Sequence, residues 1–235
     1  MRLAAVADVH FKANEREESI RRFLPVNDLA DLLVLAGDLT NHGLPEEMKV
    51  CLAVLEQVHI PIVMVLGNHD HENGHQEELA GMARIAGVHV LDGNCFEKDG
   101  VGFAGVKGFC GGFAPHELMP FGETAIKNFV EIGEREAVKL DYGLAQLQTP
   151  VKIAVMHYAP IEETVVGEPA PILPFLGSSR LGRVLARHRP ALALHGHAHH
   201  GSFSAETSSG VRVYNVALPI LRQRGEPHPF VLFSV

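Results

Sequence analysis

"LAAVADVH" (residues 3–10) begins with five small apolar residues and ends in two potential metal ligands, Asp8 and His10. A short apolar run of this kind suits a β-strand that is covered on both faces, as in a parallel sheet. The two-residue spacing points both side chains the same way in an extended chain. We therefore predict a buried strand that carries a pair of metal ligands at its carboxyl end.

Four further segments have the same form, an apolar run that changes abruptly into metal-ligand residues: "LLVLAGDLTN" (32–41), "IVMVLGNHD" (62–70), "KIAVMHYAP" (152–160) and "ALALHGHAHH" (191–200). Helix-like stretches lie between them, at 15–24, 45–58, 75–86, 123–147 and 178–188, the last after the possible cap Ser178. Strands alternating with helices predict βαβ units. Because ligands of open α/β sheets bind outside the carboxyl ends of strands, all five polar clusters are expected in one place.

The later part of the chain adds hairpins to this pattern. Residues 95–106 predict one hairpin around Asp99-Gly100, and residues 202–218 predict another that turns at Ser209-Gly210. With the terminal "FVLFSV", these segments favour a layered α/β sandwich with mixed strands over a purely parallel sheet. The 235 residues contain no linker-like composition, so we expect one domain over 1–235.

Composition excludes several classes of function. The net charge of −8, with no run of Lys or Arg, predicts no extended nucleic-acid surface, while a small anion held by metal stays possible. The three cysteines share no spacing typical of a disulfide framework or a zinc ribbon. No apolar run is long enough to span a membrane, and the amino-terminal run is too short for a signal peptide, so we expect a cytoplasmic protein. A homo-oligomer is left open.

Seven residues form the candidate ligand set: Asp8, His10, Asp38, Asn68, His157, His197 and His199. Their nitrogen and oxygen donors, with no thiolate, suit Mn, Fe, Zn, Ni or Co and disfavour an all-oxygen calcium site. Seven ligands are too many for one tetrahedral zinc ion. They suit two metal ions that share a bridging carboxylate.

The motif order D-x-H, G-D-x-x-N, G-N-H-D, H and G-H-x-H, over residues 8–199, resembles the calcineurin-like metallophosphoesterases. The resemblance implies an α/β fold, a four-layer α/β/β/α sandwich of mixed sheets. It also implies a role for each residue: Asp8, His10 and His199 bind the first metal, Asn68, His157 and His197 bind the second, Asp38 bridges the two, and His69 acts as general acid with Asp70 as a partner that orients it. Glycines 37, 67 and 196 would allow the sharp turns from strand to site.

The activity implied by the resemblance is hydrolysis of a small phosphodiester or phosphomonoester through a metal-bound hydroxide, with the diester slightly favoured. An imidazole, whose unperturbed pKa is about 6.5, suits the protonation of a leaving oxygen. "GDLTN" offers no ligand tyrosine, so the purple acid phosphatases are a poor match. The motifs contain no arginine for the phosphate, and Arg180 and Arg183 are only guesses for that role.

Two other classes compete with this interpretation. A non-catalytic, metal-containing binding or scaffold protein could keep the same fold, although the presence of all seven ligands counts against it. A TIM-barrel hydrolase does not fit, because eight βα repeats and two hairpins exceed 235 residues. Asn41 and Tyr158 could support the ligands or contact substrate, and His195 could support the ligands or simply pack. The Gly/Pro-rich loops 108–123 and 160–179 are predicted to wall the substrate cleft.

Overall fold

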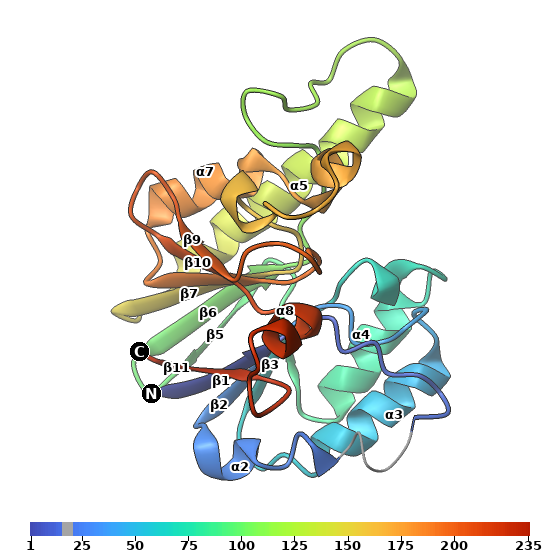
Figure 1. Ribbon diagram of the computed structural model, residues 1–235, viewed down its shortest axis with the longest axis vertical. Helices are drawn as coiled ribbons and strands as arrows, with labels where there is room; N and C mark the ends of the chain where they lie inside the picture. Colours follow the sequence, from blue (N-terminus) through green and yellow to red (C-terminus); the bar gives the residue numbers. More distant parts are fainter. Residues whose placement is uncertain (16–20) are drawn as a thin grey trace.

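Two β-sheets packed face to face form the centre of the protein in the computed structural model, which describes residues 1–15 and 21–235 (Figure 1). The strands are β1 (Arg2–Val6), β2 (Leu32–Ala36), β3 (Ile62–Val65), β4 (His89–Val90), β5 (Cys95–Lys98), β6 (Val101–Val106), β7 (Val151–Met156), β8 (Leu192–His195), β9 (Ser204–Glu206), β10 (Arg212–Asn215) and β11 (Val231–Ser234). One sheet has the order β11-β1-β2-β3-β4 and the other β5-β6-β7-β8-β10-β9. Both sheets are mixed, as predicted.

Helices cover the outer faces of the two sheets, which gives the predicted four-layer α/β/β/α sandwich (Figure 1). They are α2 (Val26–Leu29), α3 (Pro45–Leu55), α4 (Gln76–Ile85), α5 (Thr124–Gln146), α6 (Leu173–Leu176), α7 (Ser179–His188) and α8 (Leu218–Gln223). Helices α5 and α7 lie on the six-stranded sheet, and α3 and α4 lie on the five-stranded sheet. Over the described part of the chain, no helix is both long and apolar enough to cross a membrane.

Successive side chains of β6 pack into two different apolar layers, one on each face of the sheet. Phe103 belongs to the apolar core between the sheets, whereas Ala104 and Val106 belong to the cluster under α5 and α7. All three residues are fully buried. Full burial of a large apolar side chain contributes about 1.5–3 kcal/mol, so the two apolar layers hold the sheets and helices rigidly around the site.

Parallel strands occupy the middle of each sheet. Strand β1 pairs in parallel with β2 and β2 with β3, while β6, β7, β8 and β10 form the parallel set of the other sheet. Antiparallel strands stand at edges: β5 and β9 complete the two predicted hairpins, and β11 pairs with β1. Asp99 and Gly100 both have positive φ, as a two-residue hairpin turn requires.

Four of the five predicted helices are observed close to their expected bounds, as α3, α4, α5 and α7. Ser178 caps α7, because its hydroxyl accepts a hydrogen bond from the backbone nitrogen of Arg180 at 3.2 Å. Half of the helix predicted over 15–24 falls on residues 16–20, outside the described residues, and the next helix begins at Val26. The short elements β4, α6 and α8 were not predicted.

Candidate metal centre

The predicted ligands lie together on the loops that follow β1, β2, β3, β7 and β8. These loops meet where the carboxyl ends of the parallel strands of both sheets lie next to each other. Three sets of side chains place one potential ligand atom each within 4.8 Å of one another: Asp8, His10 and His199; His10, Asp38 and His69; and Asp38, His157 and His197. Asp38 belongs to two of these sets, and so it lies between the histidines of the two sheets.

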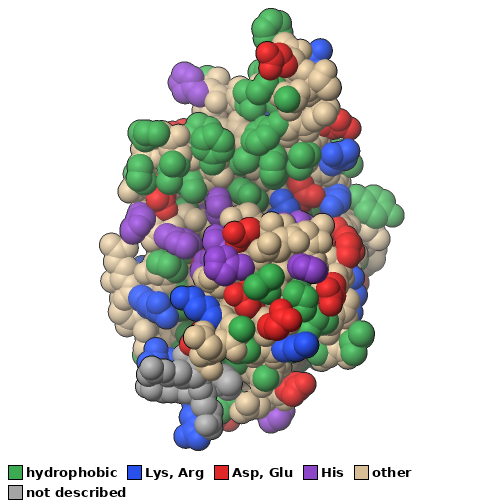
Figure 2. Space-filling model, turned by 90° about the vertical axis from the view of Figure 1, so that its right-hand side faces the viewer, with side chains coloured by type: hydrophobic (Ala, Val, Ile, Leu, Met, Phe, Trp, Pro, Cys, Tyr) green, Lys and Arg blue, Asp and Glu red, His purple; other side chains and the backbone are tan. Residues whose placement is uncertain are grey.

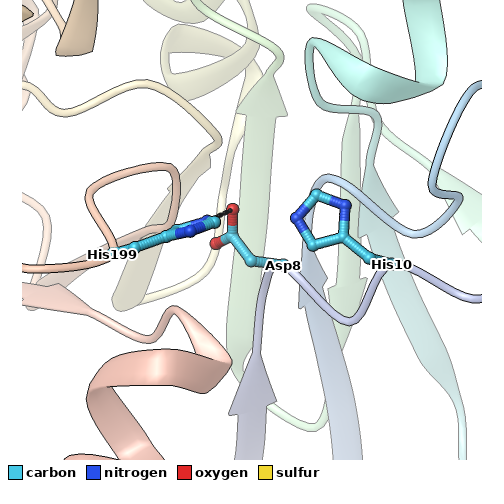
Figure 3. Close-up of side chains that lie close together, drawn as sticks. All are labelled: Asp8, His10 and His199. Atoms are coloured by element: carbon cyan, nitrogen blue, oxygen red, sulfur yellow. Dashed lines mark hydrogen bonds and ion pairs between the residues drawn. The ribbon is translucent and has the colours of Figure 1, made fainter.

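Asp8 anchors the first set (Figure 3). Its Oδ1 lies 3.0 Å from Nε2 of His199, and its Oδ2 accepts a hydrogen bond from the backbone nitrogen of His197 at 2.9 Å. Burial would raise the pKa of this carboxyl, but the hydrogen bond from His199 and the charge of His157 outweigh burial and lower it. Asp8 is therefore an ionised carboxylate at neutral pH, although it is almost completely buried.

Asp38 is the second buried carboxylate. Its Oδ1 lies 3.4 Å from Nε2 of His157, and its Oδ2 lies 3.9 Å from Nε2 of His10. The backbone nitrogen of His69 donates to Oδ1 at 2.8 Å. Burial opposes ionisation, yet the charges and hydrogen bonds of His157 and His69 lower the pKa of Asp38 well below its usual range. Its two oxygens thus face imidazoles from opposite sheets.

His157 is fixed on both ring nitrogens. Nδ1 donates to the backbone carbonyl of Ala36 at 3.0 Å, which directs Nε2 toward Asp38 and leaves it 2.8 Å from Oδ1 of Asn68. Burial lowers the pKa of His157, but Asp38 overcomes this and raises it to about 9. The side chains of Asn68, Asp38 and His157 therefore converge on one point.

His197 completes this group from the loop after β8. Its ring centroid lies 5.0 Å from that of His157 and 4.5 Å from that of the buried Tyr158. Its Nε2 lies 3.2 Å from the carbonyl oxygen of Phe175 in α6. Burial lowers the pKa of His197 to about 4, so its imidazole is neutral at pH 7, which is the form that binds metal.

Backbone strain is concentrated at these positions. Four of the predicted ligands have a positive φ, between 49° and 70°: Asp8, His10, Asp38 and His197. Among the other described residues, only two that are not glycine share this conformation, one in a hairpin turn and one at a helix end. Such a conformation costs about 1 kcal/mol or more for most residues and clusters at functional sites. The fold therefore maintains strain where the ligands converge.

Glycines make room for the close approach of the loops. Gly37 has a φ of +91°, and a Cβ there would lie 2.5 Å from Nδ1 of His157. At Gly67 and Gly196, a Cβ would collide with the carboxyl groups of Asp38 and Asp8. A side chain at any of the three positions would displace a predicted ligand.

The donor set fits metal ions on physical grounds. Asp8 and Asp38 are buried and ionised, and the ion pairs of the described residues join them only to histidines, with no Lys or Arg within 4.0 Å. Nδ1 of His10 is buried without a hydrogen-bond partner in the described part of the structure. Two buried, ionised carboxylates surrounded by imidazoles form a donor set that metal cations fit, because buried charges in proteins are paired or coordinate metals.

His69 lies at the rim of this centre. Its Nδ1 donates to the carbonyl oxygen of Asn41 at 2.7 Å, which leaves Nε2 free to point inward, 4.0 Å from Oδ2 of Asp38. The side chain is 39% exposed, and its ring lies 4.6 Å from that of His10. It is thus both accessible from solvent and held toward the centre.

The predicted pairing of Asp70 with His69 is wrong. Asp70 is completely buried, and its carboxylate accepts hydrogen bonds from the backbone nitrogens of Leu39, Thr40 and Gly67 and from the Thr40 hydroxyl, at 2.6–3.2 Å. It therefore ties the loop after β2 to the loop after β3. The partner that orients His69 is the backbone carbonyl of Asn41, which no side-chain pattern in the sequence could reveal.

Comparison with known proteins shows the family of the chain. The sequence model of the calcineurin-like phosphoesterase family matches residues 1–201, which contain all seven predicted ligands. The chain belongs to this family. The motifs over residues 8–199 lie within this match. The predicted family is thereby confirmed.

Individual proteins resemble the chain in sequence or in fold. The chain is 31% identical, over 84 residues, to the glycerophosphodiester phosphodiesterase GpdQ of Enterobacter lignolyticus; this match covers 30% of each sequence. The phosphopantetheinyl hydrolase PptH of Mycobacterium tuberculosis superposes on 98% of the chain, with 95% of its own length, a TM-score of 0.71 and 15% identity. The purple acid phosphatase PPD1 of Lupinus luteus covers 92% of the chain, with 43% of its own length, a TM-score of 0.54 and 13% identity. At these identities the two structures show a shared fold.

Other candidates do not join the candidate metal centre. His195 is fully buried, with its ring nitrogens against the Gly196 carbonyl and the Thr164 hydroxyl, so it packs beneath the loop. The two arginines guessed for phosphate both face Glu117: Arg183 forms hydrogen bonds to it at 2.9 and 3.1 Å, and Arg180 lies 3.9 Å away. Both guanidinium groups are thus already engaged.

Proposed function

We propose that this chain is a dinuclear metal-dependent phosphoesterase. The observation that carries the proposal is the position of Asp38, whose two oxygens face His157 on one side and His10 on the other. A carboxylate in this position can bridge two ions. Asp8, His10 and His199 would hold the first ion, and Asn68, His157 and His197 the second.

The donors would accept Mn, Fe, Zn or Ni, because imidazole and carboxylate suit these ions and no cysteine is among the ligands. When bound, the two cations would neutralise the charge of a phosphoester and make a water molecule more acidic. Asp8 and Asp38 would contribute negative charge that keeps the ions in place. The hydrogen bond from His157 to Ala36 would hold Nε2 ready as a ligand atom.

His69 would donate the proton that the departing oxygen needs. Because Nδ1 is committed to the Asn41 carbonyl, Nε2 is the atom that would carry and release this proton. Asp70 would act indirectly, because its hydrogen bonds hold the loops that carry Asp38 and His69. The side chain of His69 is therefore the only part of the "GNHD" motif that we assign to proton transfer.

A diester is the favoured substrate. The curated relative is named a glycerophosphodiester phosphodiesterase, which supports diester over monoester cleavage for this chain. The competing function is a metal-containing binding or scaffold protein of the same fold. The ionised carboxylates and the inward-facing Nε2 of His69 favour the enzyme.

The test is the initial rate of the Mn²⁺-loaded protein on bis-p-nitrophenyl phosphate and on p-nitrophenyl phosphate, with Asp38→Asn as control. We expect turnover of both, faster for the diester, and loss of at least a hundredfold in the control. If the control retains its rate, Asp38 does not organise the centre. If the wild-type protein binds metal but turns over neither compound, the scaffold function is favoured.

A further inference from the structure

Exposed apolar side chains are concentrated on the two loops beside the metal centre. Of eleven large hydrophobic residues that are exposed in the described part of the chain, six lie on residues 108–123 and 160–179. We call these six the apolar rim: Leu118, Met119, Phe121, Val166, Ile172 and Phe175. Figure 2 shows hydrophobic side chains gathered beside the histidine cluster. Grouped exposure of this kind marks a binding surface, because scattered residues would need no explanation.

The rim is held in place by its backbone. Nitrogens of Gly111 and Gly112 donate to the carbonyls of Pro174 and Gly177 at 2.9 and 3.0 Å, which joins the two loops. Arg180, almost completely buried, donates to the carbonyl of Leu118 at 2.9 Å. The side chains of Phe121 and Met119 nevertheless remain 85% and 61% exposed. An ordered platform of this kind would lose little entropy when a ligand covers it.

The rim is continuous with the metal centre. The carbonyl oxygen of Phe175 lies 3.2 Å from Nε2 of His197, so the loop with this 57%-exposed ring contacts a predicted ligand directly. On the other side, the carbonyl of Val166 accepts a hydrogen bond from the Ser202 hydroxyl, close to the His197–His199 loop. A phosphoester held at the centre would therefore place its substituents beside the part of the rim on residues 160–179.

We propose that the apolar rim binds an apolar substituent of the substrate, so that the preferred substrate is an amphipathic phosphodiester with an alkyl or acyl chain on one side. The inference rests on the proposed phosphoesterase function. It specifies the part of the substrate that the metal ligands do not recognise. The two loops thereby become the specificity element of the enzyme.

Charge favours a substrate over a membrane surface as the occupant. Residues 108–123 and 160–179 contain five acidic residues and no Lys or Arg. Anionic lipid headgroups and nucleic acid would be repelled by such loops. An uncharged chain attached to the phosphate would meet only the apolar side chains between the acidic residues. The acidic residues also disfavour a second copy of the same loops.

The experiment compares methyl, butyl and octyl p-nitrophenyl phosphate on the Mn²⁺-loaded protein, all below their micellar concentrations. We expect KM to fall about two- to fourfold for each methylene that the rim covers, while kcat changes little. In the double variant Ile172→Ser/Phe175→Ser, the ratio of kcat/KM for octyl to methyl should fall at least tenfold. Ile85→Ser, which changes a 90%-exposed residue on α4, should leave that ratio unchanged.

A flat dependence on chain length, or a ratio unchanged in the double variant, would overturn the proposal. Two other results would also overturn it, if chain length has no effect on the rates. One is binding of the wild-type protein to neutral phosphatidylcholine vesicles that is lost in the double variant, and the other is a dimer in sedimentation that is lost in the double variant. If no ester is turned over, the proposed function fails separately. In that case, the dissociation constants of octyl phosphate and methyl phosphate are compared by calorimetry. Tighter binding of octyl phosphate that is lost in the double variant supports the proposal for the rim, and equal binding of the two compounds rejects it.

Discussion

His69 is the residue whose role can be separated most cleanly from metal binding. Its Nδ1 is held by the Asn41 carbonyl, and its Nε2 lies 4.0 Å from Asp38. We expect His69→Ala to keep the metal content while kcat on bis-p-nitrophenyl phosphate falls about 10²- to 10⁴-fold, the usual contribution of a general acid. Metal analysis and steady-state rates check this. Undiminished kcat would remove His69 from the mechanism.

Asp70 is expected to act on stability. In Asp70→Ala, the backbone nitrogens of Leu39, Thr40 and Gly67 lose their shared acceptor and become unsatisfied inside the protein. At about 1–3 kcal/mol for each buried donor, the free energy of unfolding should fall by about 3 kcal/mol or more. Urea denaturation of the metal-free protein measures it, with the exposed Asp28→Ala as control. Equal effects of the two changes would contradict this role.

The pKa of His157 sets a pH dependence of metal affinity. Burial lowers this pKa, but the charge of Asp38 raises it to about 9. A proton must therefore leave His157 before metal binds below that pH, so Mn²⁺ affinity should rise with pH from 6.5 to 8.5, by up to about tenfold per pH unit. Calorimetry in buffers of different ionisation enthalpy should detect at least one released proton at pH 7.5. Affinity that is independent of pH would show that His157 is not a ligand.

At the scale of elements, the turn after β2 depends on Gly37. Gly37→Ala introduces both a strained φ and a Cβ 2.5 Å from Nδ1 of His157. Gly225→Ala is a matched control, because Gly225 has a φ of +74° and open space around it. This change therefore lowers the free energy of unfolding only through the unfavourable backbone conformation, by about 1 kcal/mol. Gly37→Ala should lose more unfolding free energy than the control and bind Mn²⁺ at least tenfold more weakly. Equal losses in the two variants would indicate that the packing against His157 is unimportant.

Elements were predictable where sequence carries periodicity or an abrupt change of residue type. The short apolar runs ending in Asp38, Asn68 or His157 identified buried strands and their carboxyl ends, and Ser178 identified the start of α7. Strand β4 has two residues and α8 has six, too few to show a period. The hydrogen bonds of Asp70 and Asn41 could not be foreseen, because they join loops that only the folded sheets bring together.

At the scale of the whole molecule, the fold explains why predicted ligands that are so distant in sequence lie close together. Asp8 and His199 are 191 positions apart, yet Oδ1 and Nε2 lie 3.0 Å from each other. Two parallel sets of strands, one in each sheet, end at the same edge and deliver both residues. The motif order predicted the family and the sandwich, whereas the apolar rim became visible only once the loops were placed.

The measurement that tests the central claim most directly is a Mn²⁺ titration of the metal-free protein followed by electron paramagnetic resonance. We predict that two Mn²⁺ ions bind per chain and give an exchange-coupled spectrum. In Asp38→Asn, the coupling should disappear, because the bridge between the two ligand sets is weakened. A single ion per chain, or two uncoupled ions in the wild-type protein, would contradict a dinuclear centre bridged by Asp38.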